Sequence, residues 1–394
     1  MTRYPGSSAV GAVVVGGDYQ GLGIARSLGR HGVPVVVLDD ELSIARASRH
    51  VVRHVRVDDL LDPERALAAL CDLGRSLPTS GWVLYPTREE TVVLVSRNRE
   101  LLSRWFRVPT PDFSVINAAW DKRRTYRLAE TLEIPAPRCW FPASEADLDD
   151  IPVTTPVIVK PAIKEHFIYE TRAKAWRADD RAELRRVYRA AIEVVPAEEV
   201  IVQELVPGGG DRQLAYCALF KDGAAVADMT VTRLRQHPSD FGRASTFVKT
   251  ADHPELTDLA GRFLKEVDYY GLVEVEFKRD PRDGRPKLLD VNARTWGYHT
   301  LGAAAGVDFA HLLFLDQLGA EMTPVTARSG VRWIRLATDV PNAIRDVRRG
   351  RQQARDYLRT LRGVDTEAVF SLQDPLPSLL EAALLPYLAV RRGL

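Results

Sequence analysis

Two neighbouring segments between residues 273 and 294 constrain the fold of this chain more than any other feature. Val273, Val275 and Phe277 are spaced two residues apart, so a strand through them places these apolar side chains on one face. The same strand leaves Glu274 and Glu276 on the opposite face. The pattern therefore predicts a strand with an apolar side and a side lined by carboxylates.

A tight turn is expected to bring a second polar segment opposite these carboxylates. The Asp-Gly pair at 283–284, flanked by prolines, predicts a three-residue hairpin loop with the glycine in the left-handed region. That loop would set Glu276 opposite Asp290 and Glu274 opposite Asn292. Carboxylate and amide oxygens suit Mg²⁺, which also takes waters and substrate phosphates as ligands. The sequence therefore predicts a magnesium site, the alternative being a solvated hairpin face with alternating charges.

Length, charge and cysteine usage narrow the class of protein. At 394 residues we expect two to four structural units, and the formal net charge of +1 argues against nucleic-acid or membrane binding through bulk charge. No apolar run approaches the roughly 18 residues of a spanning helix. Cys71, Cys139 and Cys217 are odd in number and lack metal-binding spacing. We expect a cytoplasmic protein without a membrane span whose partners are small molecules.

The N-terminal segment has a βαβ pattern. An apolar run at 9–15 leads through the glycine-rich turn 16–23 into a helix expected over Ile24–Arg30, and a strand over Val33–Leu38 ends in Asp39. An acidic residue about twenty positions after such a turn is typical of dinucleotide-binding domains. The glycine spacing is not that of the dinucleotide fingerprint. Because the acidic residue still fits, an NAD(P)-dependent oxidoreductase is kept as an alternative function.

The pattern continues with a helix expected over Pro63–Leu73 and a strand over Trp82–Tyr85. Arg88 and Glu89 follow the end of this strand. Ligands of open parallel sheets bind at the carboxyl ends of the strands, so both residues are candidate substrate contacts. The alternative is a helix start whose charges only interact with the helix dipole.

Lysines are few in this chain, which makes each of them informative. Only nine of the 54 basic residues are lysine. Lys160 ends a buried strand expected from Val157, and an ammonium buried without an anion is costly, which predicts a phosphate partner. Lys122 lies within a helical stretch expected from Ser114 to Glu133; taken alone, it would be an ordinary surface lysine.

Together these segments resemble the ATP-grasp superfamily of carboxylate-amine ligases, over roughly residues 8–320. The resemblance rests on Lys122, Lys160, the Gln203–Gly208 segment and the Asp-x-Asn-x-Arg string at 290–294. It implies an α/β ATP-grasp fold with an N-terminal Rossmann-like domain. The implied units are the Rossmann-like domain at 1–112, a first lobe at 113–196, a second lobe with the metal site at 197–320, and a C-terminal helical extension at 321–394.

The resemblance also implies site residues. It implies that Lys122 and Lys160 contact the nucleotide phosphates, that Glu204, Leu205 and Val206 contact adenine, and that Asp211 contacts the ribose. It implies magnesium ligands at Glu276, Asp290 and Asn292 and a contact of Arg294 with the acyl phosphate. The acceptor pocket would be lined by Gly17, Asp18 and Tyr19. Asp290 stands where the family more often has glutamate. The family's lid is usually glycine-rich, whereas no glycine occurs from Ala162 to Val206. A stiffer or longer lid, using Lys164, His166 or Lys174, is therefore expected.

An arginine beyond the next hairpin is a further candidate. Strands are expected at Gln213–Phe220 and Ala224–Arg233 around an Asp-Gly turn at 222–223. Arg235 follows the second strand, where a guanidinium could bind a carboxylate or a phosphate, or simply face solvent. Further along, a basic helical stretch is expected over Arg345–Leu361 and a docking helix over Ser378–Leu394, with loose attachment to a membrane surface as the lesser alternative.

The predicted function is ATP-dependent activation of a substrate carboxylate as an acyl phosphate, followed by its joining to an amine with release of ADP and phosphate. The chain shows lysines, arginines and metal ligands but no triad-like nucleophile, which fits phosphoryl transfer. The implied cofactors are ATP and two Mg²⁺ ions, with Mn²⁺ as a substitute. D-aspartate-ligase-like chemistry and a homodimer are further expectations. A non-catalytic ATP-binding module, a phosphate-ester-forming kinase and a biotin-type carboxylase remain alternatives.

Overall fold

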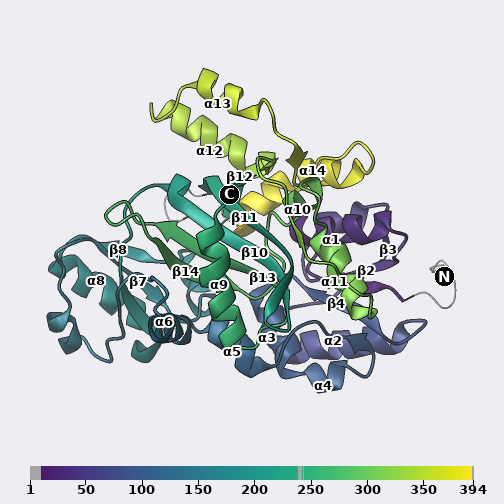
Figure 1. The fold of residues 1–394 in the computed structure, drawn as a ribbon, viewed down its shortest axis with the longest axis horizontal. Helices are drawn as coiled ribbons and strands as arrows, with labels where there is room; N and C mark the ends of the chain where they lie inside the picture. The colour runs from purple at the N-terminus through teal and green to yellow at the C-terminus, as the bar shows by residue number, and fades with distance from the viewer. Residues whose placement is uncertain (1–9, 238–241, 243, 393–394) are drawn as a thin grey trace.

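The computed structural model describes residues 10–237, 242 and 244–392, and side chains up to Tyr387. Ala9, which begins the expected N-terminal apolar run, and the last two residues of the expected C-terminal helix lie outside the described residues. Three β-sheets organise the chain. Figure 1 shows the N-terminal sheet at one side, the small sheet at the other, and the large sheet between them.

The N-terminal domain is a five-stranded parallel sheet in the order β3-β2-β1-β4-β5. Its central strands are continuous apolar runs, as expected of a sheet covered on both faces. The strands are β1 (Ala12–Val15), β2 (Val35–Asp39), β3 (Val51–Arg56), β4 (Trp82–Pro86) and β5 (Phe106–Arg107). The helices are α1 (Tyr19–Arg30), α2 (Pro63–Ser76), α3 (Glu89–Arg97), α4 (Arg99–Leu102) and the 3₁₀ turn η1 (Ile44–Ala47).

Helix α1 begins at Tyr19, not at Ile24 as the sequence suggested. The Asp18 side chain caps it by accepting a hydrogen bond from the Gln20 amide at 3.0 Å. Residue 21 of this helix must be glycine, because a Cβ there would come within 2.0 Å of the Gly16 carbonyl oxygen. The glycines therefore allow the helix to pack closely on the loop that follows β1.

The small lobe has a four-stranded antiparallel sheet in the order β6-β9-β7-β8. Since β9 pairs with β7 here, this sheet extends beyond the expected lobe boundary at residue 196. The strands are β6 (Cys139–Trp140), β7 (Val157–Pro161), β8 (Trp176–Ala178) and β9 (Val200–Glu204), with helices α7 (Glu165–Thr171) and α8 (Arg181–Ile192) and 3₁₀ turns η2 (Ala146–Asp150) and η3 (Ala197–Glu199). The 3₁₀ turn η4 (Gly210–Arg212) follows β9 and leads into the large sheet. The glycine-free segment after Lys160 thus forms helix α7, which ends at Arg172 in the left-handed conformation.

The helical stretch expected over 114–133 is two helices, α5 (Phe113–Trp120) and α6 (Lys122–Thr131). The break lies at Asp121, whose extended backbone and side-chain hydrogen bond to the Arg123 amide cap α6. Lys122 is therefore the first residue of a helix, not an interior one.

The large sheet has eight strands, in the order β14-β13-β10-β11-β12-β16-β17, with β15 paired to β11. They are β10 (Gln213–Lys221), β11 (Ala224–His237), β12 (Ala244–Thr250), β13 (Gly271–Arg279), β14 (Pro286–Asn292), β15 (Val325–Thr326), β16 (Arg332–Ile334) and β17 (Thr366–Glu367), with helices α9 (Pro254–Glu266), α10 (Thr300–Ala304) and α11 (Phe309–Gln317). The 222–223 turn was predicted correctly, since Asp222 and Gly223 both have positive φ angles.

The C-terminal region is not purely helical, because β15, β16 and β17 extend the large sheet. Its helices are α12 (Leu336–Arg348), α13 (Ala354–Leu361) and α14 (Leu376–Arg392). The expected basic helix over 345–361 is therefore the end of α12, a loop and α13. Pro386 lies inside α14 without ending it. No helix among the described residues is long and apolar enough to cross a membrane.

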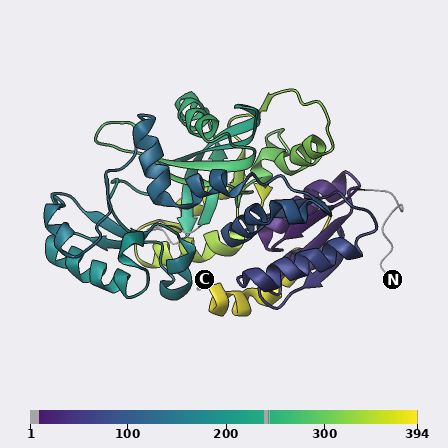
Figure 2. The ribbon, with the colours of Figure 1, turned by 90° about the horizontal axis from the view of Figure 1, so that it is seen from below.

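A buried ion pair joins this C-terminal region to the N-terminal domain. Arg26 of α1 donates from Nε to Asp374 at 2.9 Å, and both side chains are under 10% exposed. Asp374 also accepts hydrogen bonds from the Ser48 hydroxyl and the Arg49 amide. Figure 2 shows the small lobe and the N-terminal domain at opposite ends of the molecule, with the large sheet over the space between them.

Candidate functional site

The register predicted for the polar hairpin is confirmed. Strands β13 and β14 pair Glu274 with Asn292 and Glu276 with Asp290. The connecting loop, however, spans residues 280–285 and is longer than the three residues expected. Gly284 adopts the expected left-handed conformation, with φ of +72°. Asp280 closes this longer loop, because its carbonyl accepts from the Gly284 amide and its carboxylate accepts from Arg282.

The three predicted metal ligands lie together, and cationic side chains of the protein contact both carboxylates. Asn292 donates from Nδ2 to Glu276 at 3.1 Å. Arg233 lies 3.3 Å from the other Glu276 oxygen, and Lys122 pairs with Asp290. Although burial acts to raise it, Lys122 holds the pKa of Asp290 well below its ordinary value. Both carboxylates therefore stay ionised, as metal ligands must.

The donor set fits a hard cation. Glu276, Asp290 and Asn292 offer only oxygen donors, which suits Mg²⁺ better than Zn²⁺. Among the described residues no group of three or more His, Cys, Asp or Glu side chains is placed to hold a metal ion. An ion at this hairpin would therefore take two carboxylates, one amide oxygen and non-protein ligands. That incomplete protein shell is the arrangement expected where substrate phosphates complete the coordination.

A cavity of about 660 Å³ opens between the small lobe and the large sheet, and we call it the nucleotide cavity after the nucleotide contacts that the sequence resemblance implies for its residues. Lys122, Lys160, Glu204, Leu205, Val206, Glu276 and Asp290 line it. Lys160 donates to the Tyr126 hydroxyl at 2.7 Å and to Gln203 Oε1 at 2.9 Å. Burial, together with nearby Lys122, lowers the pKa of Lys160 to about 8. Its hydrogen bonds go to neutral groups, so an arriving anion would stabilise its charge.

A second lysine of this cavity, Lys174, is also buried and hydrogen-bonded to a neutral group. Lys174, before β8, donates to the Gly242 carbonyl at 3.2 Å, and burial lowers its pKa to about 8. Lys174 also lines the cavity. It was one of the three lid residues suggested by the sequence, whereas His166 lies outside the cavity and pairs with Glu199 at 2.8 Å.

The predicted adenine and ribose residues are only partly brought together. The Leu205 amide is bonded to the Pro156 carbonyl at 3.0 Å, and the Val206 carbonyl accepts from Lys278 at 2.8 Å. The Glu204 carboxylate pairs with Arg282, a residue that the sequence analysis did not select. Asp211 does not line the cavity, which the glycines at 208–210 border instead. The predicted ribose contact therefore has no support in this geometry.

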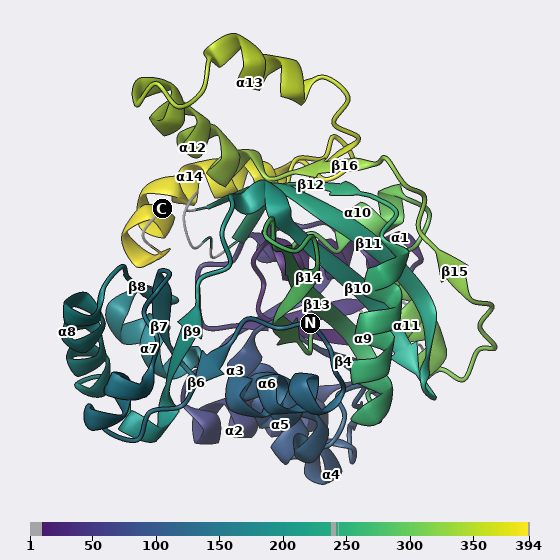
Figure 3. The same cartoon turned by 60° about the vertical axis from the view of Figure 1, so that its left-hand side comes forward.

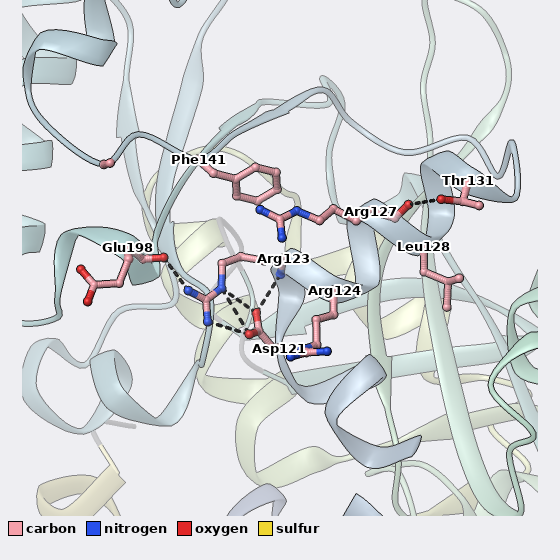
Figure 4. A pocket seen from close by; sticks show the side chains of 9 residues that line it. Asp121, Arg123, Arg124, Arg127, Leu128, Thr131, Phe141 and Glu198 are labelled. Carbon is pink, nitrogen blue, oxygen red and sulfur yellow. Dashed lines mark hydrogen bonds and ion pairs between the residues drawn. The ribbon is translucent and has the colours of Figure 1, made fainter. Parts of the chain in front are cut away.

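A separate surface cavity of about 650 Å³ lies on the other side of helix α6. Figure 4 shows Arg123 between Asp121 and Glu198, and Arg127 along the Phe141 ring. Arg123 donates bidentately to Asp121 and also to the Glu198 carbonyl at 2.6 Å. These contacts hold the start of α6, and with it Lys122, against the small lobe.

A third cavity of about 650 Å³ faces the N-terminal domain, and we call it the acceptor cavity after the acceptor pocket that the sequence resemblance implies at Asp18 and Tyr19. Four of the predicted site residues, Asp18, Tyr19, Arg88 and Arg294, line it together. Gly17 does not line it, because its amide donates to buried Asp39 at 2.6 Å.

Arg88 and its two carboxylates account for the acidic residue that suggested a dinucleotide. Arg88 pairs with Asp39 at 2.9 Å and with Asp40 at 2.8 Å. Asp39 is 1% exposed and also accepts from the Gly17 and Asp40 amides. The carboxylate that would bind a ribose is therefore used within the protein, which argues against the oxidoreductase alternative.

Arg294 and Glu89 connect the hairpin to the N-terminal domain. Arg294 donates to Glu89 at 2.8 Å and to Asn292 Oδ1 at 3.3 Å. Lys164, before α7, lies 3.5 Å from the same glutamate. Although burial opposes it, Glu89 and Glu165 raise the pKa of Lys164 above its ordinary value. Glu89 thus joins residues of three different sheets or lobes at one point.

Arg235, expected either to bind a substrate carboxylate or phosphate or to face solvent, pairs within the protein instead. It lines neither of the two cavities and pairs bidentately with buried Asp339 of α12, at 2.9 and 2.7 Å. Its guanidinium also lies 4.3 Å from the Phe247 ring centroid. Arg235 therefore holds the C-terminal helices to the large sheet, and Arg233, two residues earlier, faces the cavities instead.

Two tyrosines that hold residues of the site, Tyr126 and Tyr298, were not predicted from the sequence. Tyr126 and Gln203 hold Lys160, and Glu274 is bonded to Tyr298 and Asn292. Burial and the neighbouring Glu276 raise the pKa of Glu274 to about 7. The alternation in β13 did place Glu274 on the correct face, but nothing in the sequence pointed to Tyr298.

Among the described residues, four line both the nucleotide cavity and the acceptor cavity. Lys164, Lys174, Arg233 and Glu276 border both. A phosphoryl group bound among these residues would lie within reach of molecules in either cavity. The arrangement can therefore hold a nucleotide and a second substrate end to end, with cations and a metal-binding hairpin at the junction.

Comparison with known proteins agrees with this geometry. Residues 218–338, which include the polar hairpin, match a family model described as ATP-grasp in the biosynthetic pathway with Ter operon. The chain is 25% identical over 324 residues to the D-aspartate ligase of Enterococcus faecium (strain Aus0004), covering 78% of this chain and 76% of that protein.

Solved structures share the architecture. The L-amino acid ligase from Bacillus licheniformis superposes with a TM-score of 0.61 at 17% identity, covering 78% of this chain and 74% of that one. The N5-carboxyaminoimidazole synthetase from Staphylococcus aureus gives a TM-score of 0.64 at 13% identity, covering 87% of each chain. At such identities the likeness establishes the fold.

The protein therefore has the ATP-grasp fold, and residues 218–338 match an ATP-grasp family model. The D-aspartate ligase from E. faecium is a relative of this chain, and the sequence prediction of the superfamily is confirmed.

Proposed function

We propose that this ligase activates a small-molecule carboxylate as an acyl phosphate and joins it to an amine, releasing ADP and phosphate. The observation that supports this most directly is the shared border of the two cavities at Lys164, Lys174, Arg233 and Glu276. A γ-phosphoryl group at that border can be transferred from a nucleotide in one cavity to a carboxylate in the other. Phosphoryl transfer depends mainly on such positioning and on charge neutralisation.

In this proposal the nucleotide cavity holds ATP. Lys122, Lys160 and Lys174 face its phosphates, and the segment from Glu204 to Val206 faces the base. Glu276, Asp290 and Asn292 would hold two Mg²⁺ ions, with Mn²⁺ as a substitute. When bound, the metal neutralises charge on the transferred phosphoryl group. Lys122 pairs with Asp290 and lines the same cavity, so its charge would serve the phosphates if Asp290 bound a metal instead.

The first step transfers the γ-phosphoryl group to a carboxylate oxygen of the substrate and leaves ADP. An amine then attacks the acyl carbon, the C–O bond to phosphate breaks, and the amine nitrogen loses a proton. Arg294 lies beside Asn292 and faces the acceptor cavity, where its guanidinium can stabilise the oxyanion of the tetrahedral intermediate.

The acceptor cavity offers several carboxylates for an amine. Asp18, Glu41 and Glu90 line it, whereas Asp40 is paired with Arg88 and Glu89 with Arg294. The relative from E. faecium is named a D-aspartate ligase, which makes D-aspartate the first carboxylate to test. We place the reaction in the cytoplasm and retain a homodimer as a candidate assembly.

The test is a magnesium-dependent ADP-release assay with pools of D- and L-amino acids and short peptides, followed by mass spectrometry. We expect ADP together with a product whose mass equals two substrates minus water. The matched variants are Asp290→Asn, at the site, and Asp283→Asn, at the tip of the same hairpin, where Asp283 contacts only Lys287 and the turn. Nucleotide binding without ADP release from any pool would favour the non-catalytic module instead.

A further inference from the structure

The outward face of helix α14 is apolar, which is the reverse of a typical surface helix. Leu376 and Leu379 are 58% and 65% exposed, respectively. Between Leu376 and Tyr387, the described part of the helix exposes no charged side chain. Its exposed residues are Leu376, Leu379, Ala382, Ala383, Leu385 and Pro386.

The polar residues of α14 point inward and fix its orientation. The Ser378 hydroxyl donates to the Val369 carbonyl at 3.1 Å. Glu381 pairs with Arg335 at 2.9 Å, and this arginine lies 4.0 Å from the Tyr19 ring centroid. Turning the apolar face inward would break this buried ion pair, which is costly. The apolar face is therefore held outward.

The loop before α14 continues the apolar surface. Phe370 and Leu372 are 57% and 84% exposed. Of the thirteen large apolar residues exposed in the described part of the chain, eight lie at or after Leu336. We define the C-terminal patch as Phe370, Leu372, Leu376, Leu379 and Leu385.

Basic helices lie at the same end of the molecule. Residues 345–362 contain seven arginines and two aspartates. Arg355 and Arg359 of α13 are each 73% exposed at the side chain. Figures 1 and 3 both show α12, α13 and α14 together at the end of the molecule away from α2 and α4. Helix α14 itself runs on to Arg392.

We propose that the C-terminal patch and the arginines of α12 and α13 form a docking surface for an anionic lipid bilayer. Leucines and Phe370 would enter the head-group region, and arginines would face lipid phosphates. A second copy of the chain is the less favourable occupant, because a two-fold contact through this surface would bring two arginine-rich segments together.

The experiment is vesicle flotation with the full chain. The vesicles are phosphatidylcholine alone or with about 30% phosphatidylglycerol, at about 0.1 M salt. We expect binding to the anionic vesicles only, and about a tenfold loss in Leu376→Glu/Leu379→Glu. The control is Leu318→Glu, a substitution at a leucine that is 42% exposed at the end of α11 and should leave binding unchanged. ADP release should be unaffected in both variants, which separates this proposal from the ligase activity.

Three results would overturn the proposal. One is absence of binding to anionic vesicles, and another is equal binding by the double variant. The third is a dimer, measured by light scattering without lipid, that the double variant converts to monomer, since the patch would then be an interface between copies. Arg355→Glu/Arg359→Glu is a second variant that preserves the patch, and it should also weaken binding to anionic vesicles by severalfold.

Discussion

The nucleotide cavity and the acceptor cavity differ in how their buried cations are neutralised. In the acceptor cavity, Arg88 faces Asp39 and Asp40, and Arg294 faces Glu89. In the nucleotide cavity, Lys160 and Lys174 form no ion pair with any described carboxylate and donate hydrogen bonds only to neutral groups.

This difference indicates what each cavity can bind. A buried cation without a counter-ion costs free energy, and an arriving anion recovers that cost. The nucleotide cavity is thus prepared for a polyanion. In the acceptor cavity Arg88 and Arg294 are already balanced, so their substitution should affect stability as well as binding. Lys122 stands between the two cases, since its partner Asp290 is itself a proposed metal ligand.

The largest effect is expected from Asp290→Asn. The variant loses a charged metal ligand, and we expect ADP release to fall about a thousandfold while the fold is retained. Steady-state ADP release and circular dichroism check this. Asp283→Asn is the control on the same hairpin. Unchanged turnover in Asp290→Asn would remove the hairpin from the mechanism.

The buried ion pair between Arg26 and Asp374, which lies outside both cavities, shows how much stability is lost when such a pair is broken. Asp374→Asn breaks the buried pair with Arg26, and we expect the free energy of unfolding to fall by about 3 kcal/mol. Urea unfolding measures this. Asp72→Asn removes an exposed partner of Arg75 and should cost less than about 0.5 kcal/mol. Equal losses in the two variants would contradict the role given to the Arg26 pair.

Glu89→Gln tests whether Glu89 neutralises the cations of the acceptor cavity in the free protein. The change leaves Arg294 and Lys164 without their shared carboxylate, so we expect a loss of about 2 kcal/mol of stability. ADP release should fall as well, because Arg294 loses its anchor. A variant with full stability and reduced turnover would show that Glu89 acts only on substrate.

Lys160→Met should behave in the opposite way. The substitution removes a poorly compensated buried cation, so the free protein should be no less stable than the wild type. Affinity for MgATP should fall about thirtyfold, since a charge-assisted contact is lost. Thermal unfolding with and without MgATP measures both. If Lys160→Met unfolded at a lower temperature than the wild type and MgATP still raised its unfolding temperature as much, Lys160 would not be an uncompensated cation that binds the nucleotide.

The sequence predicted the hairpin and its register because strand alternation and an Asp-Gly turn are local signals. It predicted the N-terminal sheet for the same reason. It did not place Arg235, because the side chain is held by Asp339, more than a hundred residues away. It also missed the break at Asp121 and the role of Glu89, which depends on Arg294 and Lys164 arriving from other elements. Long-range partners of charged residues leave no local pattern.

The most direct test of the account is calorimetry of MgATP binding near pH 8 in buffers of different ionisation enthalpy. In the free protein Lys160 and Lys174 have a pKa of about 8, below the ordinary lysine value, and bound phosphates would raise it. Binding should therefore take up about one proton in total and weaken as the pH rises above about 8. Lys160→Met should take up about half as much. No proton uptake, or the same uptake in the variant, would contradict the claim that these lysines lack a counter-ion until nucleotide phosphates bind.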